Sequence, residues 1–280
     1  MANLSECGRD RGCNRSPDAR TIPFINVGYV DIHSHVLYGL DDGAKTREES
    51  VAMLEIAERS GTTDIVATPH ANSRYPFRPE LVAARIEELA AATSVRIHPG
   101  CDFHLQFDNI EDALAHPDKY TINHQGYLLV EFPEVGVFHE TDAILERLLD
   151  AGMVPIISHP ERNEYLRKHP DDLARWIATG CYVQVTAASF TGLFGRGPRN
   201  AAHDLLKRGL VHFVASDAHD TTYRTTSLTD AYAVLAGTWG EPLIEPLFVE
   251  NPRAVLAGEA IDFEFPAGAP KARRWYQFFR

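Results

Sequence analysis

From Tyr29 onward, short runs of apolar and β-branched residues alternate with helical patterns, so that seven strand candidates are each followed by a helix candidate. Most of the strand runs are apolar throughout. Continuous apolar strands joined by helices are typical of a parallel sheet that is covered on both faces. The sequence therefore predicts an α/β fold, with either an open doubly wound sheet or a closed barrel. The expected strand runs are YVDIHSH, TDIVATPH, VRIHPGCDFHL, GYLLVEFP, MVPIISHPER, CYVQVTAAS and VHFVASDAHD.

Several helix boundaries have local signals. Thr46 followed by Glu49 has the spacing of a capping box, in which two side chains satisfy backbone N–H groups at the start of a helix. Glycine commonly ends a helix because it adopts the left-handed conformation without steric cost. We expect helices to stop at Gly61, Gly152, Gly180 and Gly209.

Polar residues follow nearly every predicted strand, which favours the barrel over the open sheet. Barrel enzymes collect functional residues from the C-terminal ends of many strands, whereas an open sheet concentrates them where the strand order reverses. Histidine or acidic residues follow the first five strands and the seventh. The pattern therefore predicts a ring of strands with the functional site at one end.

Length and composition are those of one large domain. The chain has 280 residues, of which 44% are hydrophobic, which is enough to build a core. No internal repeat or low-complexity linker divides it. We expect residues 1–24 to be a flexible tail, residues 25–280 to be a single domain, and residues 242–280 to be a helical closing segment with a loose end.

The net charge restricts the class of partner. With 39 acidic and 27 basic residues the formal charge is −12, so the field of the chain repels nucleic-acid backbones and anionic membrane surfaces. No apolar stretch of about 20 residues could span a bilayer. The polar N-terminus lacks the apolar centre of a secretory signal and no CxxC pair occurs, so we expect a cytoplasmic protein. Cys7 and Cys13 could form a metal or redox pair, but incidental thiols are the better interpretation.

The first predicted strand ends in DIHSH, where His33 and His35 share one face because residues two apart on an extended chain point the same way. Both imidazoles can face one metal ion, although histidines at this spacing also occur by chance. The following turn, GLDDG, could bring the carboxylate of Asp42 over the same strand end. For Asp42 alone, an ordinary acidic turn is the simpler interpretation.

Five further strand ends carry the same residue types, in the runs TPH, GCDFH, EFP, SHPER and SDAH. Each run alone is compatible with a packed histidine or a solvated acid, but six coincidences at one face of one architecture predict a metal site. Imidazole and carboxylate donors without thiolate suit manganese, iron or zinc. The donors exceed the needs of one ion, so we expect two or three divalent ions with bridging carboxylates.

Two arginines follow the last histidine motifs closely enough to lie above the metal ions. Arg162 comes three residues after His159, and Arg224 comes five residues after His219. An arginine fork matches the oxygens of a phosphate, and a surface ion pair is the alternative for each. His104 and Asp108 could line the site or pack beside it. The histidines expected to be structural or exposed are His98, His116, His124, His139, His169, His203 and His212.

The motifs DIHSH, TPH, SHPER and SDAH, in this order, resemble the polymerase-and-histidinol-phosphatase (PHP) family. The run DIHSHVLYGLDDGAKTREES is similar to one branch, the bacterial manganese-dependent protein tyrosine phosphatases of capsule and exopolysaccharide clusters (CpsB/CapC-like), over residues 29–255. The resemblance implies a distorted seven-stranded (β/α)7 TIM-like barrel and three metal ions. It also implies hydrolysis of phosphotyrosine on the tail of a bacterial tyrosine autokinase that controls polysaccharide export.

Carried over residue by residue, the resemblance implies phosphate binding by Arg162 and Arg224 and a set of metal ligands. The implied ligands are His33, His35, Asp42, His70, Asp102, Glu131, His159, Asp217 and His219. One position departs from the family, which commonly has glutamate where this chain has Asp102. A bridging carboxylate that is shorter by one methylene must then reach two ions, so the geometry of this bridge is tighter.

The mechanistic hypothesis is that a metal-bridging hydroxide attacks phosphorus in line, while the ions and two arginines neutralise charge on the phosphoryl oxygens. No cysteine is followed by arginine six positions later, so the signature of a cysteine nucleophile is absent. Two alternatives stay open: a phosphoesterase for small molecules, such as histidinol phosphate or nucleotides, and a non-catalytic docking module. The sequence does not give the substrate protein, and it is compatible with a homo-oligomer.

Overall fold

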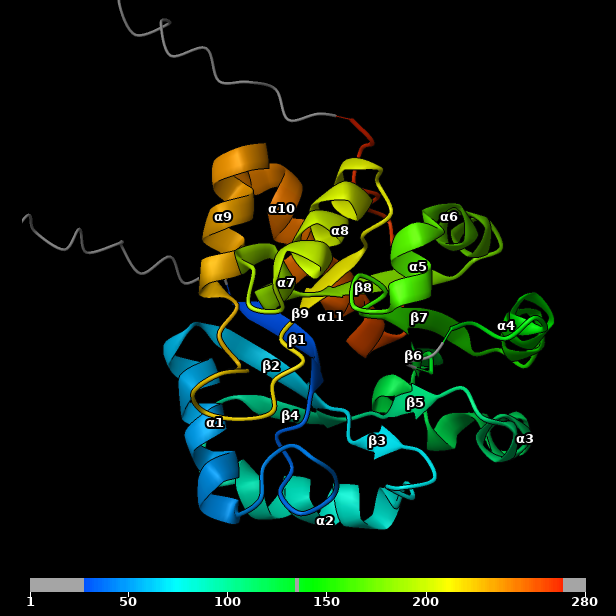
Figure 1. Ribbon diagram of the computed structural model, residues 1–280. Helices are drawn as coiled ribbons and strands as arrows, with labels where there is room; N and C mark the ends of the chain where they lie inside the picture. The colour runs from blue at the N-terminus through cyan, green and yellow to red at the C-terminus, as the bar shows by residue number, and fades with distance from the viewer. Residues whose placement is uncertain (1–27, 134–135, 269–280) are drawn as a thin grey trace, which may run out of the picture.

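The structure, a computed structural model, describes residues 28–133 and 136–268. Within this part of the chain, Figure 1 shows strands at the centre and helices around them. The segment expected to be a tail, residues 1–24, lies outside the described residues together with Cys7 and Cys13. The end of the expected closing segment, residues 269–280, also lies outside them.

Every strand pair in the described residues is parallel, and the strands form two sheets with the orders β1-β2-β4 and β3-β5-β6-β7-β8-β9. Side chains of β1, β6 and β8 are almost all buried, as expected where helices cover the strands. The predicted α/β class with parallel strands is confirmed. The strands are β1 (Tyr29–Ser34), β2 (Thr62–Ala67), β3 (His70–Ala71), β4 (Arg96–Pro99), β5 (Asp102–His104), β6 (Tyr127–Glu131), β7 (Val154–Ser158), β8 (Tyr182–Thr186) and β9 (Phe213–Ala215).

Helices follow the strands along the chain and surround them in Figure 1. They are α1 (Arg47–Arg59), α2 (Pro79–Ala90), α3 (Phe107–Ala115), α4 (Thr141–Asp150), α5 (Glu164–Lys168), α6 (Pro170–Ala178), α7 (Ala187–Thr191), α8 (Arg196–Lys207), α9 (Thr229–Trp239), α10 (Glu241–Phe248) and α11 (Glu250–Ala257), with short 3-10 turns at Pro117–Lys119 and Ile122–His124. Helices α10 and α11 supply the helical part of the predicted closing segment.

The expected helix boundaries are found, with one difference in the capping of α1. The side chain of Thr46 accepts the N–H of Glu49, as predicted. The carboxylate of Glu49 accepts the N–H of Lys45, 2.7 Å away, and not the N–H of Thr46. The expected capping box is therefore shifted by one residue on its second arm. The four predicted stop glycines all have positive φ: Gly61, Gly152, Gly180 and Gly209.

Two of the expected strands are interrupted, which is where the prediction of continuous strands was wrong. The run TDIVATPH divides into β2 and β3 at residues 68–69, and the run VRIHPGCDFHL divides into β4 and β5 at residues 100–101. Pro69 lacks the N–H that a sheet interior requires. Gly100 lies so close to its neighbour that a Cβ there would come within 2.6 Å of Val66 Cγ1. Both breaks move the next residues toward the strand ends that carry the site.

The first and last strands approach each other at their C-terminal ends. Ser34 forms an isolated parallel bridge with Ala218. Asp217 N donates to His33 O at 2.8 Å, and His35 N donates to Ala218 O at 2.9 Å. These bonds fix the loop after β9 beside the end of β1.

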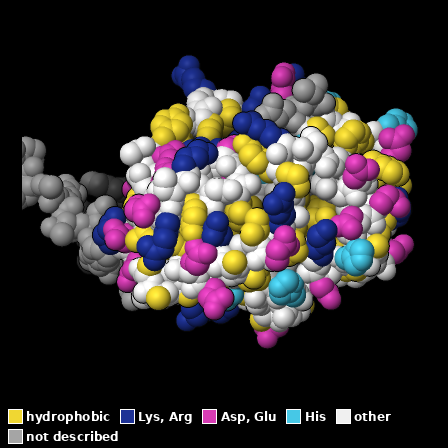
Figure 2. Space-filling model, turned by 90° about the horizontal axis from the view of Figure 1, so that it is seen from below, with side chains coloured by type: hydrophobic (Ala, Val, Ile, Leu, Met, Phe, Trp, Pro, Cys, Tyr) yellow, Lys and Arg dark blue, Asp and Glu magenta, His cyan; other side chains and the backbone are white. Residues whose placement is uncertain are grey.

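The surface carries mixed charge on the face seen from below Figure 1. On this face, shown in Figure 2, acidic and basic side chains are interspersed and do not gather by sign. No helix among the described residues is long and apolar enough to cross a membrane. The net charge of −12 is therefore not concentrated on this face.

Candidate metal centre

The C-terminal end of β1 brings His33 and His35 together. Nδ1 of His33 lies 3.0 Å from Oε1 of Gln184. Nδ1 of His35 lies 2.7 Å from Oδ2 of Asp41. Since both partners are acceptors, each Nδ1 donates to its partner, which leaves each Nε2 as the nitrogen that can bind a metal ion. The two Nε2 atoms lie 3.3 Å apart, close enough to face the same cation.

The loop after β1 returns Asp42 to the strand ends. Oδ1 of Asp42 lies 3.3 Å from Nε2 of His70 and 3.5 Å from Nε2 of His219. The turn is close because Gly43 has no side chain: a Cβ there would lie 2.1 Å from the carbonyl oxygen of His35. One potential ligand atom from each of His35, Asp42, His70 and His219 lies within 4.8 Å of the others. The acidic turn is thus part of the site.

Three further groups of potential ligands share residues with this one or with each other, each with its atoms within 4.8 Å of one another. They are His33 with Asp102 and His159, His33 with His35 and Asp217, and His70 with Asp102 and Glu131. Four residues belong to two groups each, so the groups form one continuous centre. The structure therefore brings together all nine residues that the resemblance implies as ligands.

Two of these residues have a strained backbone. His159 directly follows β7 and has φ +32°, and Asp217 follows β9 and has φ +50°. Non-glycine residues rarely adopt this left-handed region, which costs roughly 1–2 kcal/mol for each residue. The left-handed conformation turns the chain out of the strand direction at the position where each ligand side chain enters the centre. Backbone strain of this kind is typical of functional sites.

The pKa values of the ligands reflect burial and the neighbouring charges. Around His35 and His70 the carboxylates outweigh burial: they raise the pKa of His35 to about 9 and hold that of His70 well above its usual range, so a metal ion must displace a proton from each. Burial lowers the pKa of His33, and burial with the nearby charge of Arg162 lowers the pKa of His159 to about 4. Both imidazoles are therefore neutral near pH 7, as a metal ligand must be. Burial alone would raise the pKa of Glu131 and of Asp217. The neighbouring histidines and arginines outweigh burial and hold the pKa of both carboxyls well below the usual range.

Two buried side-chain atoms of the nine implied ligands have no hydrogen-bond partner among the described residues. They are Nδ1 of His70 and Oδ2 of Asp102, which lie 3.1 Å apart without hydrogen-bond geometry. Oε2 of Glu131 lies 3.3 Å from the same histidine nitrogen. Leaving a charged oxygen buried and unpaired is costly, and a divalent cation shared by these atoms removes that cost. The donor set therefore fits a metal centre.

Arg162 and Arg224 reach the edge of the centre from the loops after β7 and β9. Nη1 of Arg162 contacts Oδ2 of Asp217, and Nη2 of Arg224 lies 2.6 Å from the same oxygen. The guanidinium carbons of the two arginines lie 4.7 and 5.7 Å from the ring centre of Phe194. This aromatic contact holds two cations side by side against their mutual repulsion. Together they can bind the oxygens of a tetrahedral anion.

His104 and Asp108, for which the sequence left open whether they line the site, occupy different positions. Nδ1 of His104 lies 3.5 Å from Oε2 of Glu131, so His104 borders the centre. Asp108 is exposed in the first turn of α3. Among the described residues, none of the seven histidines expected to be structural or exposed belongs to a ligand group. His98, for example, binds Asp64 at 2.8 Å, and His212 accepts the N–H of Val183.

The sequence analysis did not identify two residues that hydrogen-bond to the ligand histidines. Asp41 is buried and accepts the N–H of Gly43 at 2.9 Å and of His70 at 3.0 Å, in addition to binding His35. Burial alone raises the pKa of Asp41, but the charge and hydrogen bond of His35 lower it to about 2. Gln184 comes from β8, the strand for which no functional residue was predicted. Its signal was a single amide within the apolar run YVQVT.

The comparisons with known proteins point to one family. The family model "Capsular polysaccharide synthesis, CpsB/CapC" matches residues 29–257. The tyrosine-protein phosphatase YwqE of Bacillus subtilis is 32% identical over 256 residues, which are 89% of this chain and 100% of that protein. The tyrosine-protein phosphatase CpsB of Streptococcus pneumoniae is 32% identical over 243 residues, 83% of this chain and 100% of that protein.

Solved structures show the same similarity. A match at 30% identity and TM-score 0.78 covers 86% of this chain and 99% of the other, from crystal structures of YwqE and CpsB, which are described as metal-dependent tyrosine phosphatases. The lactonase Lmo2620 of Listeria monocytogenes, at 13% identity and TM-score 0.55, shares the fold alone; the match covers 84% of this chain and 96% of the lactonase. The resemblance seen in the motifs is confirmed: the chain belongs to the CpsB/CapC family of capsular polysaccharide synthesis.

Proposed function

We propose that this protein is a metal-dependent protein tyrosine phosphatase, a phosphoric monoester hydrolase. The observation that carries the proposal is the convergence of nine imidazole and carboxylate ligands with two arginines at one end of the strands. The relatives YwqE and CpsB are tyrosine-protein phosphatases by name. A centre of this composition suits phosphoryl transfer, which is catalysed mainly by positioning and by charge.

We further infer that the two sheets are parts of one distorted seven-stranded barrel, the PHP fold, in a single domain. Two-residue interruptions connect β2 to β3 and β4 to β5, so each pair occupies one position of a ring. The Ser34–Ala218 bridge brings β1 next to the segment after β9. Side chains from both sheets, including Ile32, Leu129 and Phe213, share one buried cluster with Val255 of α11. These contacts support closure of the ring.

The nine ligands would hold two or three divalent ions, of which manganese is our first proposal and iron or zinc are alternatives. Residues that belong to two ligand groups, such as Asp102, are placed to bridge ions. When bound, such ions activate water and neutralise charge on a phosphoryl group. The shorter carboxylate of Asp102 already lies 3.7 Å from Nε2 of His33, within the same group of atoms. Its length therefore does not remove it from the centre.

Arg162 and Arg224 would bind the nonbridging oxygens of the phosphate. Both already share one oxygen of Asp217, so a phosphate at the edge of the centre can take over part of these interactions with little movement of either side chain. The buried thiols play no part in this scheme. Burial raises the pKa of Cys101 well above its usual range and that of Cys181 to about 11, so neither supplies a thiolate nucleophile near neutral pH.

The family supports a proposal for the substrate. We propose a phosphotyrosine on another protein, with the tail of a bacterial tyrosine kinase of capsule or exopolysaccharide synthesis as the partner, and a cytoplasmic location for the reaction. The family description supports the link to capsular polysaccharide. A small-molecule phosphatase or a docking module would share much of the same surface, so the test must separate these functions.

The test combines elemental analysis of protein purified without chelator with assays on a phosphotyrosine peptide, histidinol phosphate and a nucleotide monophosphate. We expect bound divalent metal and a preference for the peptide. Chelator should abolish activity and thiol alkylation should not. His159→Ala should lower kcat/KM by at least about 100-fold, whereas the exposed His139→Ala should not. A metal-free protein that binds the peptide without hydrolysing it would instead be a docking module.

A further inference from the structure

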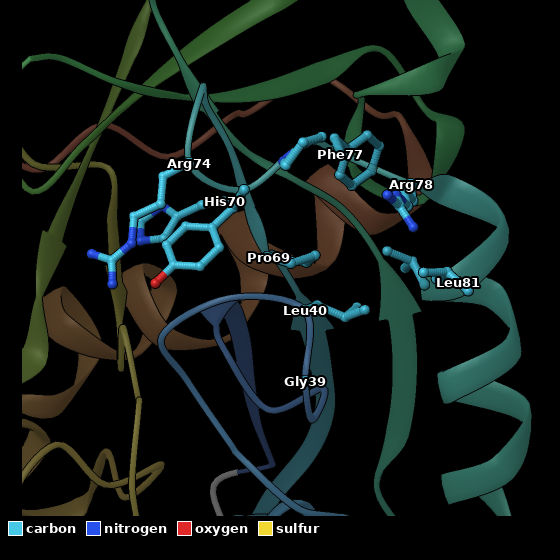
Figure 3. A pocket seen from close by; sticks show the side chains of 11 residues that line it. Gly39, Leu40, Pro69, His70, Arg74, Phe77, Arg78 and Leu81 are labelled. Carbon is cyan, nitrogen blue, oxygen red and sulfur yellow. The ribbon is translucent and has the colours of Figure 1, made fainter.

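A pocket of about 200 Å³ opens next to the metal centre and shares His70 with it. Figure 3 shows His70 and Arg74 on one side of the pocket, Pro69 and Leu40 in the middle, and Arg78 with Leu81 on the other side. The pocket lies between the loop after β1, the break between β2 and β3, the loop from β3 to α2 and the start of α2. None of its residues other than His70 is a proposed metal ligand.

The inner surface of the pocket is suited to a peptide. Leu40, Pro69, Phe77 and Leu81 give it apolar walls. Tyr75 also lines it, and its ring lies nearly parallel to that of His70, at 15° and 6.1 Å between ring centres. The pocket is therefore continuous with a metal ligand on one side and offers apolar and aromatic surface for side chains beyond it.

The two arginines at the pocket lack acidic partners. No ion pair or side-chain hydrogen bond joins the guanidinium of Arg74 or Arg78 to another described residue, and Arg74 only lies 4.9 Å above the ring of Tyr75. By contrast, Arg85 on the same helix α2 pairs with Glu88 at 2.8 Å. Arg74 and Arg78 lie on opposite sides of the pocket, so an acidic group inside it can approach either guanidinium without displacing an acidic partner.

The positive charge of the pocket comes from side chains and not from the start of α2. Pro79, the first residue of α2, has no N–H, and Glu80 places a carboxylate in the first turn. Leu81 N and Val82 N already donate to Arg78 O. Glu80 does not line the pocket, so Arg74 and Arg78 are the charged side chains that face it beside His70.

We propose that this pocket binds the residues that flank the phosphotyrosine and selects acidic side chains there, through Arg74 and Arg78. The inference rests on the proposed function, since it assigns the part of the substrate that lies beyond the phosphate. A phosphotyrosine whose phosphate lies at the metal centre places its neighbouring residues within reach of the adjoining pocket. Charge complementarity then favours glutamate or aspartate over lysine at these positions.

The first experiment compares three phosphotyrosine peptides that differ only in having Glu, Gln or Lys at the two positions on each side of the phosphotyrosine. We expect kcat/KM to fall roughly tenfold from the Glu to the Lys peptide, mainly through KM, because exposed ion pairs contribute modestly. The difference should shrink at high salt. Equal kcat/KM for the three peptides would overturn the proposal, whatever the behaviour of any variant.

The second experiment reverses the charge of the pocket. In the double variant R74E/R78E we expect the order of the three peptides to reverse. The matched control is Arg59→Gln, because Arg59 is exposed and pairs only with Glu55 on α1; it should keep the order of the wild type. An unchanged order in a folded R74E/R78E protein would contradict the assignment to these arginines.

Binding gives a readout that does not depend on turnover. Peptides with a phosphonate analogue of phosphotyrosine and a fluorescent label should bind in the same order, measured by anisotropy. Failure of the proposed function would appear as no hydrolysis of any peptide by metal-loaded wild type. Failure of the further inference alone would appear as hydrolysis and binding of all three peptides without preference.

Discussion

At the scale of single residues, the ligands of the centre depend on partners that coordinate nothing themselves. Oxygens of Gln184 and Asp41 accept hydrogen bonds from Nδ1 of His33 and His35 and thereby direct both Nε2 atoms to the same position. Partners of this kind fix the tautomer and orientation of a metal-binding histidine, and their loss usually weakens metal binding. Asp41 also accepts the backbone N–H of His70, so it connects the loop after β1 with β3.

Replacing Asp41 with asparagine should therefore weaken the metal centre without removing a ligand. The amide has no charge and can present its NH2 group to His35, which would place the proton on Nε2. We expect metal affinity to fall by about 10–100-fold and activity to recover partly when metal is added in excess. Calorimetric titration of chelator-treated protein measures this affinity. Asp108→Asn, an exposed change in α3, is the control, and wild-type affinity in Asp41→Asn would refute the role given to Asp41.

The sequence predicted which residues are ligands better than it predicted the residues that hydrogen-bond to those ligands. A histidine or acid at the end of a buried strand can be recognised locally, because the C-terminal ends of parallel strands meet at one edge. The contact between His33 and Gln184 joins residues 151 positions apart, and no local pattern marks it. Asp41 and Asp42 are adjacent in one turn, and the contacts of the folded turn decide which carboxylate faces which histidine.

At the scale of elements, the order of strands and helices followed from periodicity, and the stop glycines followed from their conformational freedom. The interruptions of two strands were not predicted from the sequence. Pro69 signals a break in a sheet, but the close approach at Gly100 depends on Val66, which belongs to the neighbouring strand β2. The breaks were therefore tertiary effects, and they place His70 and Asp102 directly opposite each other as partners in β3 and β5.

One buried histidine connects two strands away from the metal ligands. Nδ1 of His212 accepts the N–H of Val183 at 3.1 Å just before β9, and its ring packs edge-on against Tyr182 in β8. Burial lowers the pKa of His212 to about 4, from an ordinary value of 6.5. Between these values the unfolded chain binds a proton that the folded protein does not. The contribution of His212 to stability is thus complete above pH 6.5 and is lost as the pH falls toward 4.

We expect His212→Asn to reduce the acid sensitivity of folding, because the asparagine oxygen can accept the N–H of Val183 but does not titrate. From pH 7 to pH 5 the wild type should lose about 2 kcal/mol more unfolding free energy than His212→Asn. Urea unfolding of metal-depleted proteins at both pH values measures the difference. Equal losses in the two proteins would show that His212 is not the titrating group.

At the scale of the whole molecule, the strands collect like charges at one place. Four carboxylates, from Asp42, Asp102, Glu131 and Asp217, come from separate loops and strands and lie among the ligand groups. The sequence predicted that they meet but could not show how the ring closes, because closure depends on the bonds between the end of β1 and the loop after β9. The centre therefore ties together elements from both ends of the described chain.

Metal binding should consequently stabilise the entire fold and not only the site. Ions that bind the folded state alone add about 4 kcal/mol when present at 1,000 times their Kd. For a chain of this size we expect an increase in Tm of about 8–16 °C on adding manganese to chelator-treated protein, measured by calorimetry. A variant with both β1 histidines replaced, H33A/H35A, should show little of this increase. An equal Tm with and without metal in the wild type would contradict this prediction. It would show that bound ions neither join the strand ends nor relieve the repulsion among the four carboxylates.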